Sequence, residues 1–160
     1  MKIIPAVLLP LALVALSCGQ IVRADDAADA KTIARGKVFY QNCVACHQAT
    51  GLGVPSVFPP LVGSDWVTGN EDRLIRVVLH GMSGKVTIKD VAYNGNMPAF
   101  GLGLGFNWTD DKVAAVLSYV RKSWGNSAPM ITKEKVAEVR TKGAPGRKTA
   151  WTAAELESFK

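Results

Sequence analysis

The sequence has few of the side chains that most metal and dithiol sites need. Its 160 residues include only 3 cysteines and 2 histidines. A structural zinc site takes about four Cys, His or carboxylate ligands at short spacings, and beyond residues 43–47 the chain offers only Cys18 and His80. No βαβ pattern surrounds the C-x-x-C spacing, as a thioredoxin-like pair would require. These absences disfavour a zinc site and a dithiol oxidoreductase.

A basic stripe is also missing. The formal net charge is +6, but residues 25–130 carry 10 basic and 9 acidic side chains, and residues 131–160 carry 7 and 4. A nucleic-acid interface would need clustered basic residues with aromatic or groove-reading elements. We therefore expect no nucleic-acid partner.

The apolar run at residues 3–17 is too short for a comfortable transmembrane helix. Lys2 precedes it and the small-x-Ala pattern ending at Ala24 follows, which predicts an export signal over residues 1–24, cleaved after Ala24. Residues 14–18 also resemble a bacterial lipobox, in which Cys18 becomes a lipidated first residue. Both alternatives predict an exported, periplasmic protein, which meets the membrane only if Cys18 is lipidated.

What the chain does contain is one C-x-x-C-H segment at residues 43–47. This spacing is typical of covalent attachment of a c-type haem. Cys43 and Cys46 lie on one helical turn and can reach the two vinyl groups of one porphyrin, and His47 then supplies an imidazole to the iron. The cofactor expected is one haem c per chain, covalently attached.

The flanking segments supply candidate residues for the haem pocket. Residues 27–46 have helical spacing, and Phe39, four positions before Cys43, is expected on the same face, against the haem edge. Residues 48–70 are rich in glycine and proline and predict a loop that wraps the haem. A carbonyl within it, near Pro59 and Pro60, could accept a hydrogen bond from His47 Nδ1–H and orient the ring.

The second axial ligand is predicted to be Met97. A thioether is a soft ligand suited to haem iron, and Pro98 stiffens the loop that carries Met97. Met82, in a Gly-Met-Ser-Gly turn, is the alternative, and Met130 lies beyond the last expected core helix. His80 ends a predicted helix, where a histidine more often complements the helix dipole than binds a metal.

Three further elements are predicted along the chain. A helix capped by Asn70 continues to His80 and ends at Gly81. Residues 82–107 are irregular, with short extended pieces at 85–88 and 91–93 that could form a small hairpin. Thr109 caps a helix that extends to residue 124, ends at Gly125 and packs against the 27–46 helix.

Residues 127–160 are predicted to be an extension of the main domain, residues 25–126. Thr132 is expected to cap a short helix, and Thr152 with Glu155 forms a capping-box pattern before a last one. Trp151 either docks on the core or contacts a partner.

The order of these motifs resembles a class I c-type cytochrome over about residues 27–125. The resemblance implies an all-α fold wrapped around one covalent haem, with Gly/Pro-rich loops and here a short helical C-terminal extension. It implies His47 and Met97 as axial ligands, Cys43 and Cys46 as thioether attachments, and Pro59 or Pro60 as the carbonyl source. The family's helix-crossing glycine corresponds to residue 35, an arginine here, with a glycine following, so the crossing is expected to shift by one residue.

We therefore expect an electron carrier rather than an enzyme. Its partners would be redox proteins: a dehydrogenase or quinol-oxidising complex as donor, and an oxidase or reductase as acceptor. One alternative is a haem subunit of a larger oxidoreductase, with the C-terminal extension as its docking segment. The other is a peroxidase-like enzyme or gas sensor, which would need an open iron site.

Overall fold

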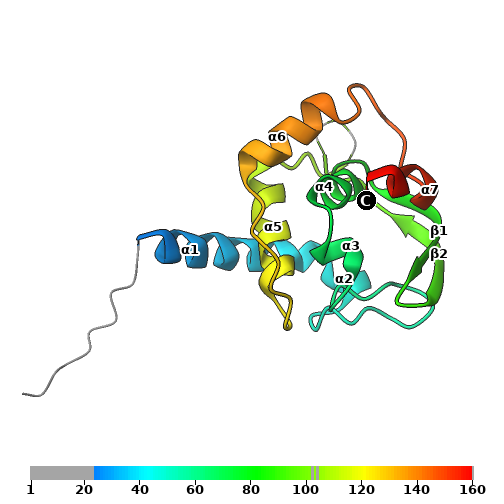
Figure 1. Ribbon diagram of the computed structural model, residues 1–160, viewed down its shortest axis with the longest axis horizontal. Helices are drawn as coiled ribbons and strands as arrows, with labels where there is room; N and C mark the ends of the chain where they lie inside the picture. The colour runs from blue at the N-terminus through cyan, green and yellow to red at the C-terminus, as the bar shows by residue number, and fades with distance from the viewer. Residues whose placement is uncertain (1–23, 102, 104, 160) are drawn as a thin grey trace, which may run out of the picture.

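The structure of the chain, a computed structural model, describes residues 24–101, 103 and 105–159. Cys18 and residues 1–23 of the expected export signal lie outside the described residues. In chain order the elements are α1 (Ala24–Phe39), η1 (Tyr40–Asn42), α2 (Val44–His47), α3 (Asp65–Thr68), α4 (Glu71–His80), β1 (Met82–Ile88), β2 (Val91–Met97), α5 (Asp110–Lys122), α6 (Lys133–Lys142), α7 (Ala153–Leu156) and η2 (Glu157–Phe159). The predicted all-α class is confirmed, with a small hairpin inserted between α4 and α5 (Figure 1). No helix in the described part of the chain has the length and hydropathy that a membrane crossing requires.

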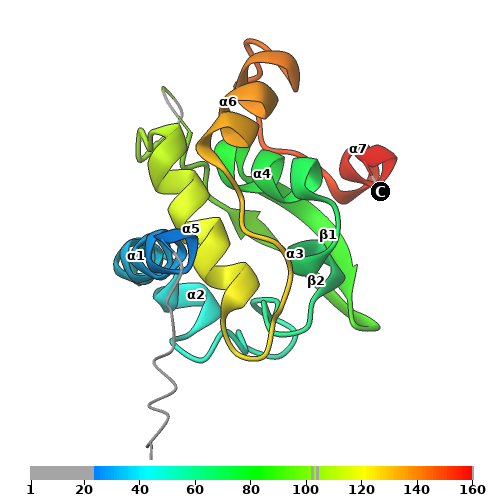
Figure 2. The same ribbon diagram turned by 60° about the vertical axis from the view of Figure 1, so that its left-hand side comes forward.

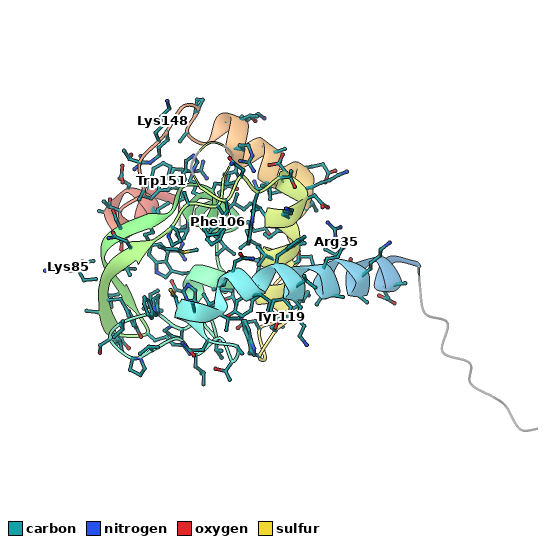
Figure 3. All side chains as sticks on the ribbon, turned by 180° about the vertical axis from the view of Figure 1, so that it is seen from behind. Arg35, Lys85, Phe106, Tyr119, Lys148 and Trp151 are labelled. Atoms are coloured by element: carbon teal, nitrogen blue, oxygen red, sulfur yellow. The ribbon has the colours of Figure 1, made fainter. Side chains whose placement is uncertain are left out.

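Helices α1 and α5 cross closely, with Gly36 at their contact (Figure 2). A Cβ atom at Gly36 would overlap the carbonyl oxygen of Ala115 and lie 2.7 Å from Cβ of Tyr119. An ion pair between Arg35 and Asp111 joins the two helices beside this point, and Figure 3 shows Arg35 and Tyr119 flanking the crossing. The predicted packing of these helices is confirmed, and the close approach uses Gly36.

The single helix predicted over residues 27–46 is divided in the structure. Helix α1 begins earlier, at Ala24, and changes at Tyr40 into the 3-10 turn η1. The N–H of Cys43 donates to the carbonyl of Tyr40 at 2.8 Å, and a new helical turn, α2, follows. The tighter turn changes which side chains share the face of Cys43, because residues three apart eclipse one another in a 3-10 helix.

The hairpin is longer than the sequence predicted. Strands β1 and β2 pair antiparallel from Ile88 opposite Val91 to Met82 opposite Met97. The two-residue turn between them, Lys89 and Asp90, has φ values of 51° and 63°. Both residues have the left-handed backbone conformation that a two-residue hairpin turn requires. Met97 is therefore the last residue of a strand rather than part of a free loop.

Helix α4 lies at the centre of the core. Asn70 caps it as predicted, since its side-chain oxygen accepts the Arg73 N–H at 3.0 Å. Apolar side chains of α4 pack with those of α5 in one buried cluster, which includes Leu74, Ile75, Val78, Leu79, Val113, Val116, Leu117 and Val120.

The segment after α5 packs on this same core. Ile131, Val136 and Val139 are buried with the α4 and α5 side chains. Ser118 fixes the start of the segment, because its hydroxyl accepts the N–H of Ile131 at 3.0 Å and donates to its carbonyl at 3.1 Å. Residues 131–139 therefore contribute to the main hydrophobic core.

Helices α3 and α5 also differ from prediction. Helix α3, capped by Ser64, lies inside the stretch expected to be a loop. Helix α5 ends at Lys122, and Trp124 follows it with a φ of 55°. Trp124 still packs inward, with its ring 5.1 Å from that of Tyr40. Thr109 occupies the N-cap position of α5, but its side chain makes no capping hydrogen bond.

Candidate functional site

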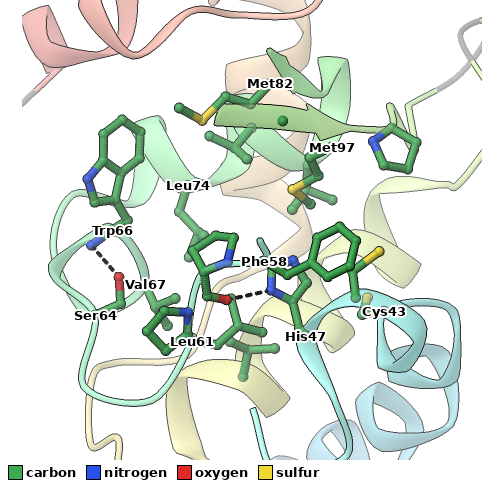
Figure 4. Close-up of a pocket in the computed structure, with 18 of the residues that line it drawn as sticks. Cys43, His47, Phe58, Leu61, Ser64, Trp66, Val67, Leu74, Met82 and Met97 are labelled. Carbon is green, nitrogen blue, oxygen red and sulfur yellow. Dashed lines mark hydrogen bonds between the residues drawn. The ribbon is translucent and has the colours of Figure 1, made fainter. Parts of the chain in front are cut away.

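A deep, apolar pocket lies between the C-x-x-C-H turn and the hairpin (Figure 4). Its empty space, including the open mouth, is about 1300 Å³. Apart from His47, the described residues that line it include no Asp, Glu, Lys, Arg or further His, and the few polar side chains include Asn42, Ser64, Tyr93 and Asn96. The cavity therefore suits a large, mostly apolar group.

Both cysteines of the motif line this pocket. Cys43 lies where η1 meets α2, and the N–H groups of Cys46 and His47 donate to its carbonyl at 3.2 and 2.8 Å. This single turn holds the two thiols and the imidazole in a fixed relation. Cys43 and Cys46 are both free thiols.

The Cys43 thiol lacks the character of a redox-active thiol. Burial, and to a smaller extent the neighbouring Cys46, raise the pKa of the Cys43 thiol to about 11. Reactive dithiols show the opposite, a lowered pKa that favours the thiolate. Among the described residues, no group of three or more His, Cys, Asp or Glu side chains is placed to hold a metal ion.

His47 is oriented by one hydrogen bond. Its Nδ1 lies 3.0 Å from the carbonyl oxygen of Pro59. A carbonyl only accepts, so Nδ1 carries the proton and Nε2 of the neutral ring keeps its lone pair. Burial lowers the pKa of His47, against the opposing effect of the Pro59 bond, so the ring is neutral at pH 7. Pro60 lines the pocket beside Pro59 but does not make this bond.

Met97 lies across the pocket from His47 (Figure 4). The backbone holds it on both sides. Upstream is the hairpin ladder, and downstream the N–H groups of Phe100 and Gly101 each donate, at 2.9 Å, to carbonyls in the last turn of α4. These bonds use carbonyls that a helix end leaves unpaired. The Met97–Pro98 segment is therefore tied to the core at both ends.

The other candidate sulfurs differ in placement. Met82 lines the pocket too, directly opposite Met97 in the hairpin register. Its sulfur is turned away from Met97, toward the side of Trp66 (Figure 4), and it packs with a second apolar cluster that contains Trp151. Met130 does not line the pocket.

Phe39 and Tyr40 differ in their relation to this pocket. Phe39 does not line the pocket but packs on Trp108, with ring centroids 6.1 Å apart. Tyr40, which is 1% exposed, lines it instead, and its hydroxyl donates to the carbonyl of Gln48 at 2.7 Å. The cause is the 3-10 turn before Cys43. In a 3-10 helix residues three apart share a face, so Tyr40 lies on the same face as Cys43 and Phe39 does not.

Several pocket residues carried no site assignment in the sequence analysis. They come from the irregular stretch and the hairpin, and include Tyr93, Phe100 and Trp108. The ring centroids of Phe100 and Trp108 lie 4.5 Å apart, and both side chains are nearly fully buried. No periodic pattern marks them, so only their bulk and proximity to the Met-Pro segment could have suggested their role.

His80 lies away from this pocket. Its ring meets the Trp151 ring edge-on at 6.0 Å, and its buried Nδ1 has no hydrogen-bond partner among the residues that the structure describes. Burial lowers the pKa of His80; the backbone of Arg76 acts in the opposite direction, and nearby guanidinium groups lower it further. Those groups belong to Arg147, Arg140 and Arg76.

Comparison with known proteins places this geometry in a family. The sequence model described as "Cytochrome c" matches residues 33–124. The chain belongs to the cytochrome c family. Membership implies a covalently bound haem c and identifies the chain as an electron-transfer haem protein. The pocket fits such a group, because its lining is almost wholly apolar and brings two thiols and one imidazole together on a single turn.

Relatives of two kinds match this cytochrome. It is 34% identical over 118 residues to "Cytochrome c-552" of Thermus thermophilus, with 68% of this chain and 86% of the relative covered. It is 33% identical over 118 residues to "Alcohol dehydrogenase (quinone), cytochrome c subunit" of Gluconacetobacter polyoxogenes, covering 72% of this chain but 24% of the relative. A "Fructose dehydrogenase cytochrome subunit" of Gluconobacter japonicus is 28% identical over 116 residues, covering 71% and 23%.

Proposed function

We propose that this cytochrome is an electron carrier with one haem c per chain and with both axial positions of the iron filled by protein ligands. The observation that supports this most is the pocket itself, in which His47 and Met97 face one another across an apolar cavity (Figure 4). When bound, the haem supplies a one-electron cycle between ferrous and ferric iron. One C-x-x-C-H segment in the sequence supports one haem.

Attachment is assigned to the two thiols. Cys43 and Cys46 would each hold the haem through a thioether, formed by addition of the thiol to one of its two vinyl groups. The high pKa of Cys43 keeps its thiol protonated before attachment and disfavours disulfide exchange. Afterwards neither cysteine is available for other chemistry.

His47 and Met97 are assigned as the axial ligands. The Pro59 carbonyl orients His47 and increases its basicity, and the ties on either side of Met97 hold its sulfur in place. A Met/His pair raises the reduction potential of the haem. The surrounding apolar side chains exclude water and so add to this effect.

The same lining argues against a peroxidase or gas sensor. Apart from the proposed ligand His47, the part of the pocket wall that the structure describes includes no histidine, carboxylate, lysine or arginine that could move a proton at the iron. Such an enzyme would also need a vacant iron position. Met97 is placed to fill it.

The test is a spectroscopic comparison of two methionine variants. Ferric, haem-loaded wild type should be low-spin with the weak far-red band of methionine–iron ligation. Met97→Ala should lose that band. Met82→Ala, a matched change of the residue directly opposite in the hairpin, should keep it. Loss of the band in Met82→Ala alone would assign the sulfur ligand to Met82 and contradict the proposal.

Electron donors and acceptors are proposed by class. Matches to cytochrome subunits of dehydrogenases support a dehydrogenase or quinol-oxidising complex as donor, with an oxidase or reductase as acceptor. Residues 1–24 are proposed to direct export to the periplasm, with Cys18 as an alternative lipid anchor. Mass analysis of the mature chain distinguishes cleavage after Ala24 from an acylated Cys18.

A second candidate is a subunit of a larger oxidoreductase, which the names of the same relatives favour. The native mass of the haem-bearing species in its own cell extract discriminates the two. A free carrier elutes at the mass of one chain, whereas a subunit elutes with a larger enzyme.

A further inference from the structure

The C-terminal segment adds a strand-like contact to the base of the hairpin. The N–H of Trp151 donates to the carbonyl of Gly81 at 3.0 Å, and its carbonyl accepts the N–H of Ser83 at 2.8 Å. Together these two bonds form a parallel bridge between Trp151 and Met82. The C-terminal segment therefore pairs with the two-stranded hairpin as a third, very short strand, at Met82.

That point is the one closest to Met97. Met82, which Trp151 brackets, is the register partner of Met97. Gly81, whose carbonyl Trp151 binds, packs so closely on the carbonyl of Met97 that a Cβ atom at Gly81 would overlap it. A two-stranded hairpin is at best marginally stable on its own, so the additional pairing with Trp151 at its base limits the movement of Met97.

The Trp151 side chain anchors this contact. It is 6% exposed and packs with Val77 and Leu156, and both Met82 and Met97 lie against the same cluster. Figure 3 shows Trp151 beside the hairpin, with Lys148 farther out in the loop before it. Trp151 therefore shares one apolar cluster with Met97, in addition to making the backbone bridge to the hairpin.

Arg147 and Glu155 form an ion pair, here called the clasp, that covers the Trp151 indole and holds it in place. The Arg147 guanidinium lies over the Trp151 ring, with its carbon 3.6 Å from the ring centroid. The same guanidinium donates to both carboxylate oxygens of Glu155 at 3.0 Å, and Glu155 closes a capping box with Thr152. Residues on both sides of Trp151 are thus tied to one another.

We propose that Trp151 is a positioning residue for Met97: it restrains the base of the hairpin and keeps the methionine sulfur on the iron. The inference rests on the proposed ligation by Met97. Loosening this restraint should increase the fraction of molecules in which the sulfur has left the iron. An external ligand that binds only that fraction gains apparent affinity in proportion to it.

The test is a titration of the ferric, haem-loaded full chain with imidazole, followed by the far-red band. Trp151→Ala should bind imidazole at least tenfold more tightly than wild type. Trp151→Phe should stay within threefold, because it keeps an aromatic anchor and, among the described residues, the indole Nε1 has no hydrogen-bond partner to lose.

Ile131→Ala is the matched control. Ile131 is 2% exposed in the same C-terminal segment but packs on the α4–α5 core and does not line the pocket. It should lower overall stability and leave imidazole affinity within threefold of wild type. If Trp151→Ala yields no folded protein, Arg147→Gln, which opens the clasp, should raise the affinity at least threefold.

An equal rise in imidazole affinity in Ile131→Ala and Trp151→Ala would overturn the inference, since it would reflect general destabilisation of the fold. Unchanged affinity in Trp151→Ala, or in Arg147→Gln where that variant replaces it, would also overturn it. Failure of the proposed function looks different: the wild type itself would lack the far-red band.

Discussion

Substitution of Gly36 by alanine tests the helix crossing that positions the C-x-x-C-H turn. The new methyl group would overlap the carbonyl oxygen of Ala115 and approach Tyr119 Cβ to 2.7 Å. The obstructing atoms include backbone, which cannot rotate aside as the end of a flexible side chain can. Helices α1 and α5 must therefore separate.

The magnitude follows from two opposing effects. Overpacking of a well-packed contact costs about 1–3 kcal/mol, and a backbone obstruction belongs at the upper end. The higher helix propensity of alanine raises the free energy of unfolding by about 1 kcal/mol relative to glycine. We expect Gly36→Ala to lower the free energy of unfolding by about 2 kcal/mol. With an m-value of about 2 kcal/mol/M, the urea midpoint should fall by about 1 M.

Urea unfolding of the ferric, haem-loaded protein measures this change. Lys37→Ala is the control, because Lys37 is exposed on the same helix beside Gly36 and its replacement should change stability by at most about 0.5 kcal/mol. A Gly36→Ala variant as stable as wild type would refute the tight crossing.

Three further variants test other parts of the fold by the same urea assay. Asn70→Ala removes the cap of α4 and should cost about 1 kcal/mol; a neutral result would mean that the cap contributes nothing. The buried Arg121 guanidinium donates to the carbonyls of Val67 and Gly69 at 2.9 and 3.1 Å. Arg121→Met leaves both carbonyls unpaired and should lower the free energy of unfolding by about 3 kcal/mol. A variant as stable as wild type would show that these hydrogen bonds do not stabilise the fold. His80 has a lowered pKa in the folded chain, so the unfolded chain binds this proton first as the pH falls. The stability that neutral His80 contributes is therefore present above about pH 6.5 and lost below it, and His80→Gln should lose less stability than wild type between pH 7.5 and pH 5.

The features that short sequence patterns encode could be predicted. The spacing of Cys43, Cys46 and His47 and the Met97–Pro98 pair indicated the family before any geometry was known, and the family match agrees. The caps at Asn70, Thr132 and Thr152 are local hydrogen bonds between residues three apart, so sequence alone indicates them, and the structure contains all three.

Features that depend on tertiary contact could not be predicted. The full hairpin was missed because its turn, Lys89–Asp90, lacks the glycine that usually marks two left-handed residues. The place of Tyr40 in the pocket was not predicted, because the change from α-helix to 3-10 helix before Cys43 leaves no clear pattern in the sequence. The pairing of Trp151 with β1 joins residues about seventy positions apart, and nothing in either segment identifies the other.

Exposure of the ferrous, haem-loaded protein to carbon monoxide tests the central claim most directly. If His47 and Met97 fill both axial positions, the spectrum should remain unchanged at neutral pH, and Met97→Ala should bind carbon monoxide at once. Prompt binding by the wild type would show an open iron site. It would contradict the electron-carrier account and favour an enzyme or gas sensor.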